Sequence, residues 1–159
     1  MKKNNIYTMF PIMIGEFHNP NHDEIKSELI SFMDDYEKKN MDSREGKENF
    51  NLFESNYNLH HEKNEALSKI INFIAQCFLS MSNNINKKYI DGMKNKNLKF
   101  DVKIKNSWFI KYKKGGAVMP HDHGECSMSC VYYVQVDDDT NLENGSTYFL
   151  RPYNRGTTH

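Results

Sequence analysis

Apolar residues recur at helical spacing in the first quarter of the chain. The stripe runs from Ile25 to Tyr36 and predicts an amphipathic helix over about Asn21–Lys39. Asn19-Pro20-Asn21 supplies an Asn cap at its start, and acidic Asp23 and Glu24 lie in its first turn, which is typical of a helix start. We expect this helix to serve packing.

A second, longer helical pattern runs from Glu62 to about Tyr89. Its apolar positions are Leu67, Ile70, Ile71, Ile74, Cys77, Phe78, Met81 and Ile85. A helix of this kind is expected to cover one face of a sheet. The polar stretch between the two helices, Asn40–Asn51, has no such period and reads as a loop.

Strand-like patterns dominate the rest of the chain. Ile6–Ile14 predicts a short strand edged by Pro11, and Leu98–Ile104 alternates apolar with polar residues. Asn106–Lys113 repeats that alternation, and Lys113–Gly116 is expected to close a hairpin. Two packing helices followed by antiparallel strands favour an α+β domain whose sheets form a double-stranded β-helix, or jelly roll. We expect one domain over residues 1–159, with the N-terminal helices packed on one sheet.

Composition and charge narrow the function classes. The 21 Lys and Arg residues balance the 21 Asp and Glu residues, so no net field recruits nucleic acid or an anionic membrane. An odd count of three cysteines favours a reducing compartment. Since no stretch is long and apolar enough to span a bilayer and no signal core follows Met1, we expect a cytoplasmic protein, in the host cytoplasm if it is viral.

The histidine pair of Pro120-His121-Asp122-His123 is the strongest chemical signal. In an extended strand His121 and His123 project to the same side and can share one ion, while Asp122 points away. Imidazole suits iron, zinc, copper and nickel, so the pair predicts a metal site without naming the metal.

The pair stands within a longer order of parts. Ser107-Trp108, Tyr112 and Lys114-Gly115 precede it, and Ser129-Cys130-Val131-Tyr132-Tyr133 follows it. This order resembles the 2-oxoglutarate/Fe(II)-dependent oxygenases of bacteriophages and marine bacteria. Weaker likenesses are Phe10-Pro11 and the run from Gly145 to an Arg151-Pro152 exit.

The resemblance implies a 2-oxoglutarate- and Fe(II)-dependent dioxygenase that hydroxylates a small-molecule or peptidyl substrate of unknown identity. It places the first iron ligand at His121, with His123 where the family usually has a carboxylate. Asp122 and the Glu125 of His123-Gly124-Glu125 stay open as alternative ligands. For the cosubstrate 2-oxoglutarate, the resemblance suggests the hydroxyl of Tyr112 and the charge of Arg151 or Arg155.

The resembled family carries a distal histidine and a cosubstrate arginine on later strands. This chain ends at His159, so we expect a C-terminally truncated domain without its last strands. The resulting open barrel would expose strand edges, which a homo-oligomer or another partner would have to cover. Catalytic competence therefore depends on what completes the site.

Other interpretations compete with the oxygenase. A non-catalytic metal-binding or structural jelly roll keeps the histidines without turnover, and a cupin-type metalloprotein shares Gly115 and His121-x-His123 but expects a glutamate where Cys126–Ser129 stands. Cys126 and Cys130 allow a mixed Cys/His zinc site. Two weaker signals are adjacent His60-His61, which diverge too far to share an ion easily, and the aspartates after Val136, which lack the spacing of a calcium loop.

Overall fold

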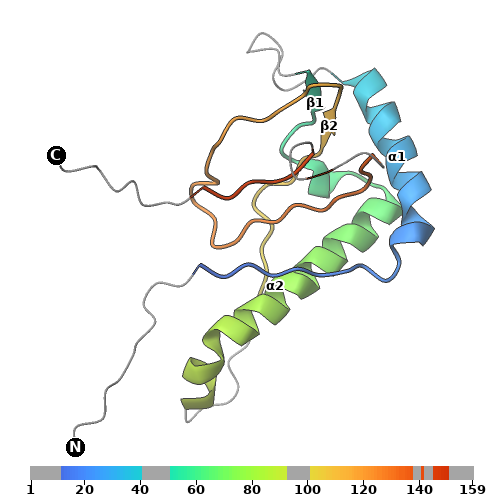
Figure 1. The fold of residues 1–159 in the computed structure, drawn as a ribbon. Helices are drawn as coiled ribbons and strands as arrows, with labels where there is room; N and C mark the ends of the chain where they lie inside the picture. The colour runs from blue at the N-terminus through green and yellow to red at the C-terminus, as the bar shows by residue number, and fades with distance from the viewer. Residues whose placement is uncertain (1–11, 41–50, 93–100, 138–140, 142–144, 151–159) are drawn as a thin grey trace, which may run out of the picture.

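The structure is a computed structural model that describes residues 12–40, 51–92, 101–137, 141 and 145–150 (Figure 1). Its elements follow in the order α1 (His22–Lys39), β1 (Leu52–Glu54), the short 3-10 helix η1 (Leu59–His61), α2 (Glu65–Gly92) and β2 (Ile110–Tyr112). The predicted helices are thus both confirmed. Within the described residues, no helix combines the length and the apolar character needed to cross a bilayer.

Helix α1 forms where charge and apolar period agree. Asp23 and Glu24 lie in its first turn, and Lys38 and Lys39 lie in its last turn. The acidic side chains therefore face the positive end of the helix dipole and the basic side chains face its negative end, which stabilises the helix. Asn19 begins the turn into the helix, because its side-chain oxygen accepts a hydrogen bond of 3.0 Å from the Asn21 N–H. The apolar stripe is buried against the rest of the molecule at Ile25, Leu29 and Tyr36.

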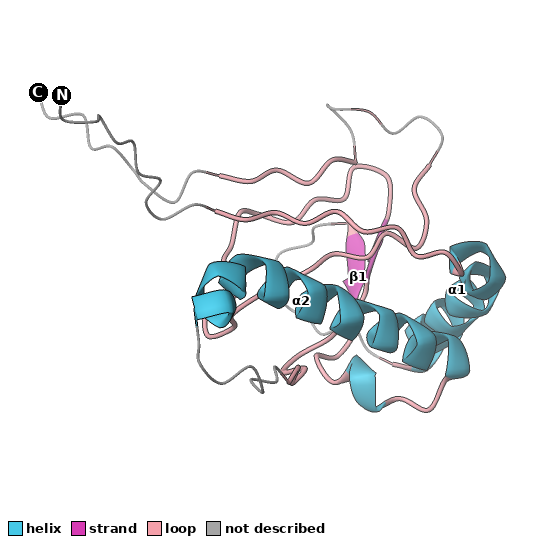
Figure 2. Cartoon of the chain, turned by 90° about the horizontal axis from the view of Figure 1, so that it is seen from below, coloured by secondary structure: helices cyan, strands magenta, loops and turns pink. Residues whose placement is uncertain are grey.

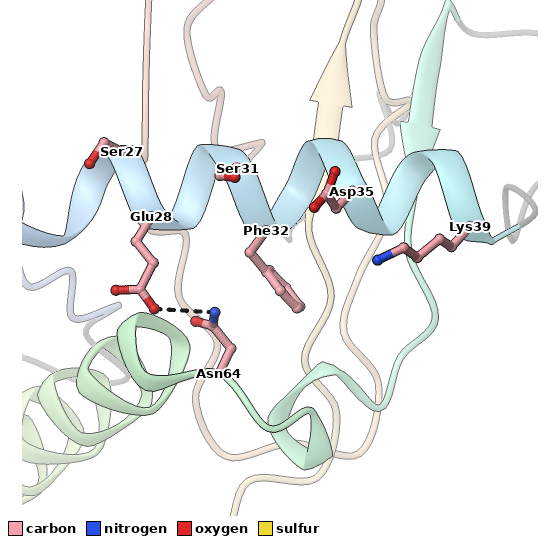
Figure 3. A pocket seen from close by; sticks show the side chains of 7 residues that line it. All are labelled: Ser27, Glu28, Ser31, Phe32, Asp35, Lys39 and Asn64. Carbon is pink, nitrogen blue, oxygen red and sulfur yellow. Dashed lines mark hydrogen bonds between the residues drawn. The ribbon is translucent and has the colours of Figure 1, made fainter.

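Helix α2 begins at a polar junction with α1. Asn64 caps it, since its side-chain oxygen accepts a 2.8 Å hydrogen bond from the Leu67 N–H. Glu28 of α1 accepts hydrogen bonds of 3.3 Å from the Asn64 side-chain amide and from the Ala66 N–H (Figure 3). Figure 2 shows the two helices crossing at this end of α2.

Two short strands form one antiparallel sheet. Phe53 of β1 pairs with Lys111 of β2, flanked by Leu52 with Tyr112 and Glu54 with Ile110. The pairing continues past the strands, because the Ser55 N–H donates to the Phe109 carbonyl at 3.1 Å and the Ser107 N–H donates to the Tyr57 carbonyl at 3.0 Å. Strand β2 lies in the predicted Asn106–Lys113 segment, whereas β1 falls outside every strand we predicted.

An ion-pair cluster ties the sheet to α1. Lys111 Nζ lies 2.6 Å from Asp34 Oδ1 and 2.7 Å from Glu37 Oε2. The hydrogen bond from Lys111 lowers the pKa of Asp34, and the two carboxylates raise the pKa of Lys111. Beneath this cluster lies the core. The ring of Phe109 meets the ring of Tyr36 of α1 edge-on, with ring centres 5.6 Å apart. The buried core residues are Ile25, Leu29, Tyr36, Phe53, Leu59, Ala66, Leu67, Ile70 and Phe109.

The jelly roll prediction is wrong. The described residues contain two α-helices and a single two-stranded sheet, and the chain after β2 continues in extended stretches that form no further described strand (Figure 1). Lys114 and Gly115 do form a turn, closed by a 2.8 Å hydrogen bond from the Gly116 N–H to the Lys113 carbonyl, but no described strand follows it to make a hairpin. Strand β2 pairs instead with distant β1.

The reason lies in what an alternating pattern specifies. Tyr132 and Val134 pack against the core while Val131 and Tyr133 are exposed, so alternation sets the faces as predicted. A sheet also needs a ladder of backbone hydrogen bonds between neighbouring strands, which alternation does not supply. Residues 101–105 behave likewise: Val102 and Ile104 are half-buried, yet the segment forms no strand.

Several predicted features fall partly or wholly outside the described residues. Residues 6–11 of the expected first strand lie outside the described residues, and residues 12–14 form no strand. The same holds for the expected loop over residues 41–50 and for the start of the Leu98–Ile104 pattern. Arg151, Arg155 and His159 also lie outside the described residues.

Candidate metal centre

His121 and His123 lie close together in an irregular segment beyond the Lys114-Gly115 turn. Their ring centres are 5.0 Å apart with an interplanar angle of 49°, and both residues are exposed. Metal–nitrogen bonds of about 2.0–2.1 Å place two imidazoles on one tetrahedral ion with ring centres about 5 Å apart. The separation of the ring centres is therefore compatible with a shared metal ion, and the metal site itself stays a prediction.

A backbone contact presents one nitrogen of His121 for coordination. His121 Nδ1 lies 2.9 Å from the Met119 carbonyl oxygen. A carbonyl oxygen only accepts, so Nδ1 carries the hydrogen and donates it, and Nε2 is the ring nitrogen that could bind a metal. Metal-binding histidines are usually oriented in this way, with the second ring nitrogen donating to a carbonyl or carboxylate.

Aromatic stacking orients the second histidine. The His123 ring lies 5.6 Å from Trp108, nearly parallel at 22°. Trp108 in turn meets the edge of Tyr57 at 5.2 Å and 81°. The Tyr57 hydroxyl donates to Glu54, which is buried in β1. A connected row of side chains thus runs from the sheet to the exposed histidine.

The local sequence explains why Trp108 faces His123. Ser107 and Phe109 bond to the 55–59 segment through their backbones, which holds this stretch extended. Phe109 enters the core, and successive side chains of an extended chain point to opposite faces. Trp108 is therefore directed away from the core, toward the later segment that bears the histidines.

The two alternative carboxylate ligands are engaged elsewhere. Asp122 Oδ1 accepts a 3.0 Å hydrogen bond from the Gly124 N–H, and Gly124 has a φ of +53° that suits this turn. Glu125 Oε2 lies 2.7 Å from Lys105 Nζ in an exposed ion pair. Across the described part of the chain, no three or more His, Cys, Asp and Glu side chains gather as a set of metal ligands.

Of the residues suggested for binding the cosubstrate, the structure describes Tyr112 but not Arg151. Tyr112 ends β2 opposite Leu52, with 55% of its surface exposed. Arg151, the residue with which it was paired in the resemblance, lies outside the described residues. The geometry therefore places Tyr112 on the strand that leads into the Lys114-Gly115 turn, and the histidines follow that turn.

His60 makes a contact that sequence reasoning missed. Its backbone N–H donates to Ser107 Oγ at 2.7 Å, and its Nδ1 lies 2.8 Å from the same oxygen. Burial lowers the pKa of His60, and neighbouring His61 lowers it further, so the neutral ring accepts the Ser107 hydroxyl hydrogen. This contact fixes η1 on the strand segment. No spacing in the sequence could connect residues so far apart.

A hollow of about 430 Å³ lies on the opposite side of α1 from the sheet, beside the start of α2 (Figure 3). Its rim carries charged and polar groups, and the ring of Phe32 forms part of its wall. None of the candidate metal ligands lines it; the lining residues are Ser27, Glu28, Ser31, Phe32, Asp35, Lys39 and Asn64. It is therefore a separate surface feature.

Comparison of the chain with protein-family models, with curated proteins and with solved structures finds no match in any of the three.

Proposed function

We propose that this chain carries a 2-oxoglutarate- and Fe(II)-dependent oxygenase centre in which His121 and His123 hold the iron. The observation that carries the proposal is the pair of neighbouring imidazole rings, with centres 5.0 Å apart, in which His121 Nδ1 donates to the Met119 carbonyl and so leaves Nε2 available to a metal. Neutral imidazoles are good ligands for ferrous iron. The order of motifs around the pair, which resembles that of the oxygenases, is the reason for proposing 2-oxoglutarate as the cosubstrate.

Each residue has a distinct task in this proposal. When bound, ferrous iron with 2-oxoglutarate and dioxygen would supply the oxidation of a substrate C–H bond to an alcohol, with one oxygen atom going to the alcohol, the other to succinate, and carbon dioxide released. Trp108 holds the imidazole of His123 in one orientation and shields it on one face. Tyr112 donates its hydroxyl to the cosubstrate carboxylate, and Arg151 balances the negative charge of that carboxylate.

The substrate in this proposal is a small molecule or a peptidyl side chain, and the site of action is the cytoplasm. Balanced charge gives no support to a nucleic-acid substrate. The exposed apolar residues Val131 and Tyr133 offer a face for a second copy of the chain, which would make the protein a homo-oligomer.

One observation favours a second function, metal binding without turnover. Glu125 is paired with Lys105, and Asp122 closes its own turn, so each carboxylate has a partner other than the histidines. A pair of imidazoles alone can retain a divalent ion in a structural or storage role. A cupin-type metalloprotein would also retain metal but would not need 2-oxoglutarate.

Anaerobic titration of the full chain with ferrous iron separates these functions. The oxygenase predicts a visible charge-transfer band that requires 2-oxoglutarate, followed by succinate when oxygen is admitted. The band should vanish in His121→Ala and persist in His61→Gln, which changes another exposed histidine. Metal retention without succinate would support the second function instead. Absence of both would overturn the metal centre itself.

A further inference from the structure

Two of the three cysteines lie on facing surfaces of the fold. Cys77 is half-buried on α2, and Cys130 lies in the extended stretch that packs against this helix. Residues 73 and 77 are one helical turn apart and share a helix face. Residues 130, 132 and 134 share one side of an extended chain, and Tyr132 and Val134 on that side pack against the core.

One ring contact sets the register between the two elements. Phe73 of α2 meets Tyr132 edge-on, with ring centres 6.3 Å apart. Moving four residues along a helix covers about 6 Å, and moving two residues along an extended chain covers about 6.6 Å. If the two run in opposite directions, Cys77 comes opposite Cys130. Figure 1 shows the stretch that leads to residue 137 running in the direction opposite to α2, and a negative charge on Cys77 contributes to raising the pKa of Cys130.

The segment is held in this register from its other side as well. The Tyr132 hydroxyl accepts a 3.0 Å hydrogen bond from the Asn19 amide and lies 2.9 Å from His22 Nδ1. Tyr132 is thereby fixed between the start of α1 and Phe73 of α2. A fixed Tyr132 limits how far Cys130 can move from α2.

We propose that Cys77 and Cys130 form an oxidation site, joined as a disulfide by hydrogen peroxide or by a low-molecular-weight disulfide. The thiolate of Cys130 attacks one peroxide oxygen, which gives a sulfenic acid and releases water after proton uptake. The thiolate of Cys77 then attacks that sulfur and displaces hydroxide, which leaves as a second water. The two sulfurs lose two electrons, and the peroxide gains them.

This site is independent of the proposed metal centre, since it uses neither histidine and no iron. Its consequence is structural: the bond would tie residues 128–134 to α2 at a point soon after the histidine segment. Burial raises the pKa of both thiols, so the reactive thiolates are scarce at neutral pH. The site is expected to oxidise slowly at neutral pH and faster in alkaline solution.

Peroxide treatment of the full chain tests the proposal. The Cys126→Ser variant removes the exposed third thiol and keeps the proposed pair. It should lose both free thiols and about 2 Da of mass without forming dimers, and peptide mapping should join Cys77 to Cys130. Its Tm should rise by roughly 5–10 °C and return on reduction with dithiothreitol. The rate of crosslinking should increase from neutral pH to about pH 9.

Single variants complete the test. Cys77→Ser and Cys130→Ser, each in the Cys126→Ser background, should give no crosslink within the chain and no rise in Tm. In the unmutated chain the crosslink should still join Cys77 to Cys130, because Cys126 is not part of the pair. Sulfinic acids or glutathione adducts at both cysteines without a crosslink would overturn the proposal. So would a bond from Cys77 or Cys130 to Cys126, or disulfides formed solely between chains.

Discussion

The indole of Trp108 lies stacked on the imidazole of His123, with ring centres 5.6 Å apart and planes 22° from parallel. This stack joins the strand segment, which the sheet holds in place, to an exposed segment without regular secondary structure. A ligand on such a segment loses conformational freedom when it binds a metal. Stacking removes part of that freedom beforehand, which favours binding.

Replacing Trp108 with leucine should therefore weaken metal binding without abolishing it. We expect the Kd for Co²⁺ or Zn²⁺ to rise by about tenfold, as for other groups that orient metal ligands. Trp108→Phe keeps an aromatic face and should stay close to the unmutated Kd. Calorimetric titration of the three proteins measures this. An unchanged Kd in Trp108→Leu would mean that the stack plays no part in holding His123.

Leu29 tests the assignment of the core. Its side chain is fully buried on α1, in contact with the cluster that joins α1 to α2 and the sheet. Leu29→Ala should lower the free energy of unfolding by about 2–5 kcal/mol, because it removes buried methyl groups and leaves a cavity. Ile85→Ala, at an exposed position of α2, should cost less than about 1 kcal/mol. Urea unfolding compares them, and equal losses would contradict the core described here.

Both helices could be predicted because their information is local. The stripe from Ile25 to Tyr36 fixes the buried face of α1, and α2 was expected from Glu62 to about Tyr89 and is found at Glu65–Gly92. Periodicity and charged ends are enough to specify such elements. The start of α2 is three residues later than expected, where Asn64 supplies the cap.

The sheet could not be predicted, because its information is not local. Strand β1 is only Leu52–Glu54, too short for its alternation to stand out, and its partner β2 is far along the chain. The jelly roll was wrongly predicted for the same reason. Alternation at Tyr132 and Val134 specifies which side of the chain is buried, but it does not specify a neighbouring strand to pair with. At the candidate metal centre, the proximity of His121 and His123 could be predicted from their spacing in the sequence. The Trp108 stack and the Met119 contact needed three-dimensional structure.

Tyr132→Phe tests how the 128–134 segment is anchored. The substitution removes the hydroxyl that contacts Asn19 and His22 but keeps the ring against Phe73. A lost hydrogen bond costs about 1 kcal/mol, so amides near residue 132 should exchange with deuterium about fivefold faster. Val131→Ala, at an exposed neighbour, should leave exchange unchanged. Equal protection in the two variants would show that the ring alone anchors the segment.

The lowered pKa of His60 predicts a dependence of stability on pH. Burial lowers this pKa below its ordinary value of 6.5, so the unfolded chain takes up a proton at a higher pH than the folded chain. The contribution of neutral His60 to the free energy of unfolding is therefore complete above pH 6.5. It is lost as the pH falls through the lower pKa of His60 in the folded chain.

Urea unfolding at several pH values checks this dependence. His60→Gln should flatten the part of the curve just below pH 6.5, because glutamine does not titrate. Ser107→Ala, which removes the oxygen that contacts Nδ1, should lower stability most where His60 is neutral. Parallel curves for His60→Gln and the unmutated chain would contradict a folded-state pKa that differs from the unfolded one.

We propose that His121 and His123 share one metal ion, and titration with Co²⁺ followed by its visible absorption measures this. Cobalt reports both stoichiometry and coordination, and it binds the same imidazole ligands as ferrous iron. We predict one equivalent bound by the full chain, lost in His121→Ala and in His123→Ala, and retained in His61→Gln. Binding that survives both alanine substitutions, or that disappears in His61→Gln, would contradict the claim.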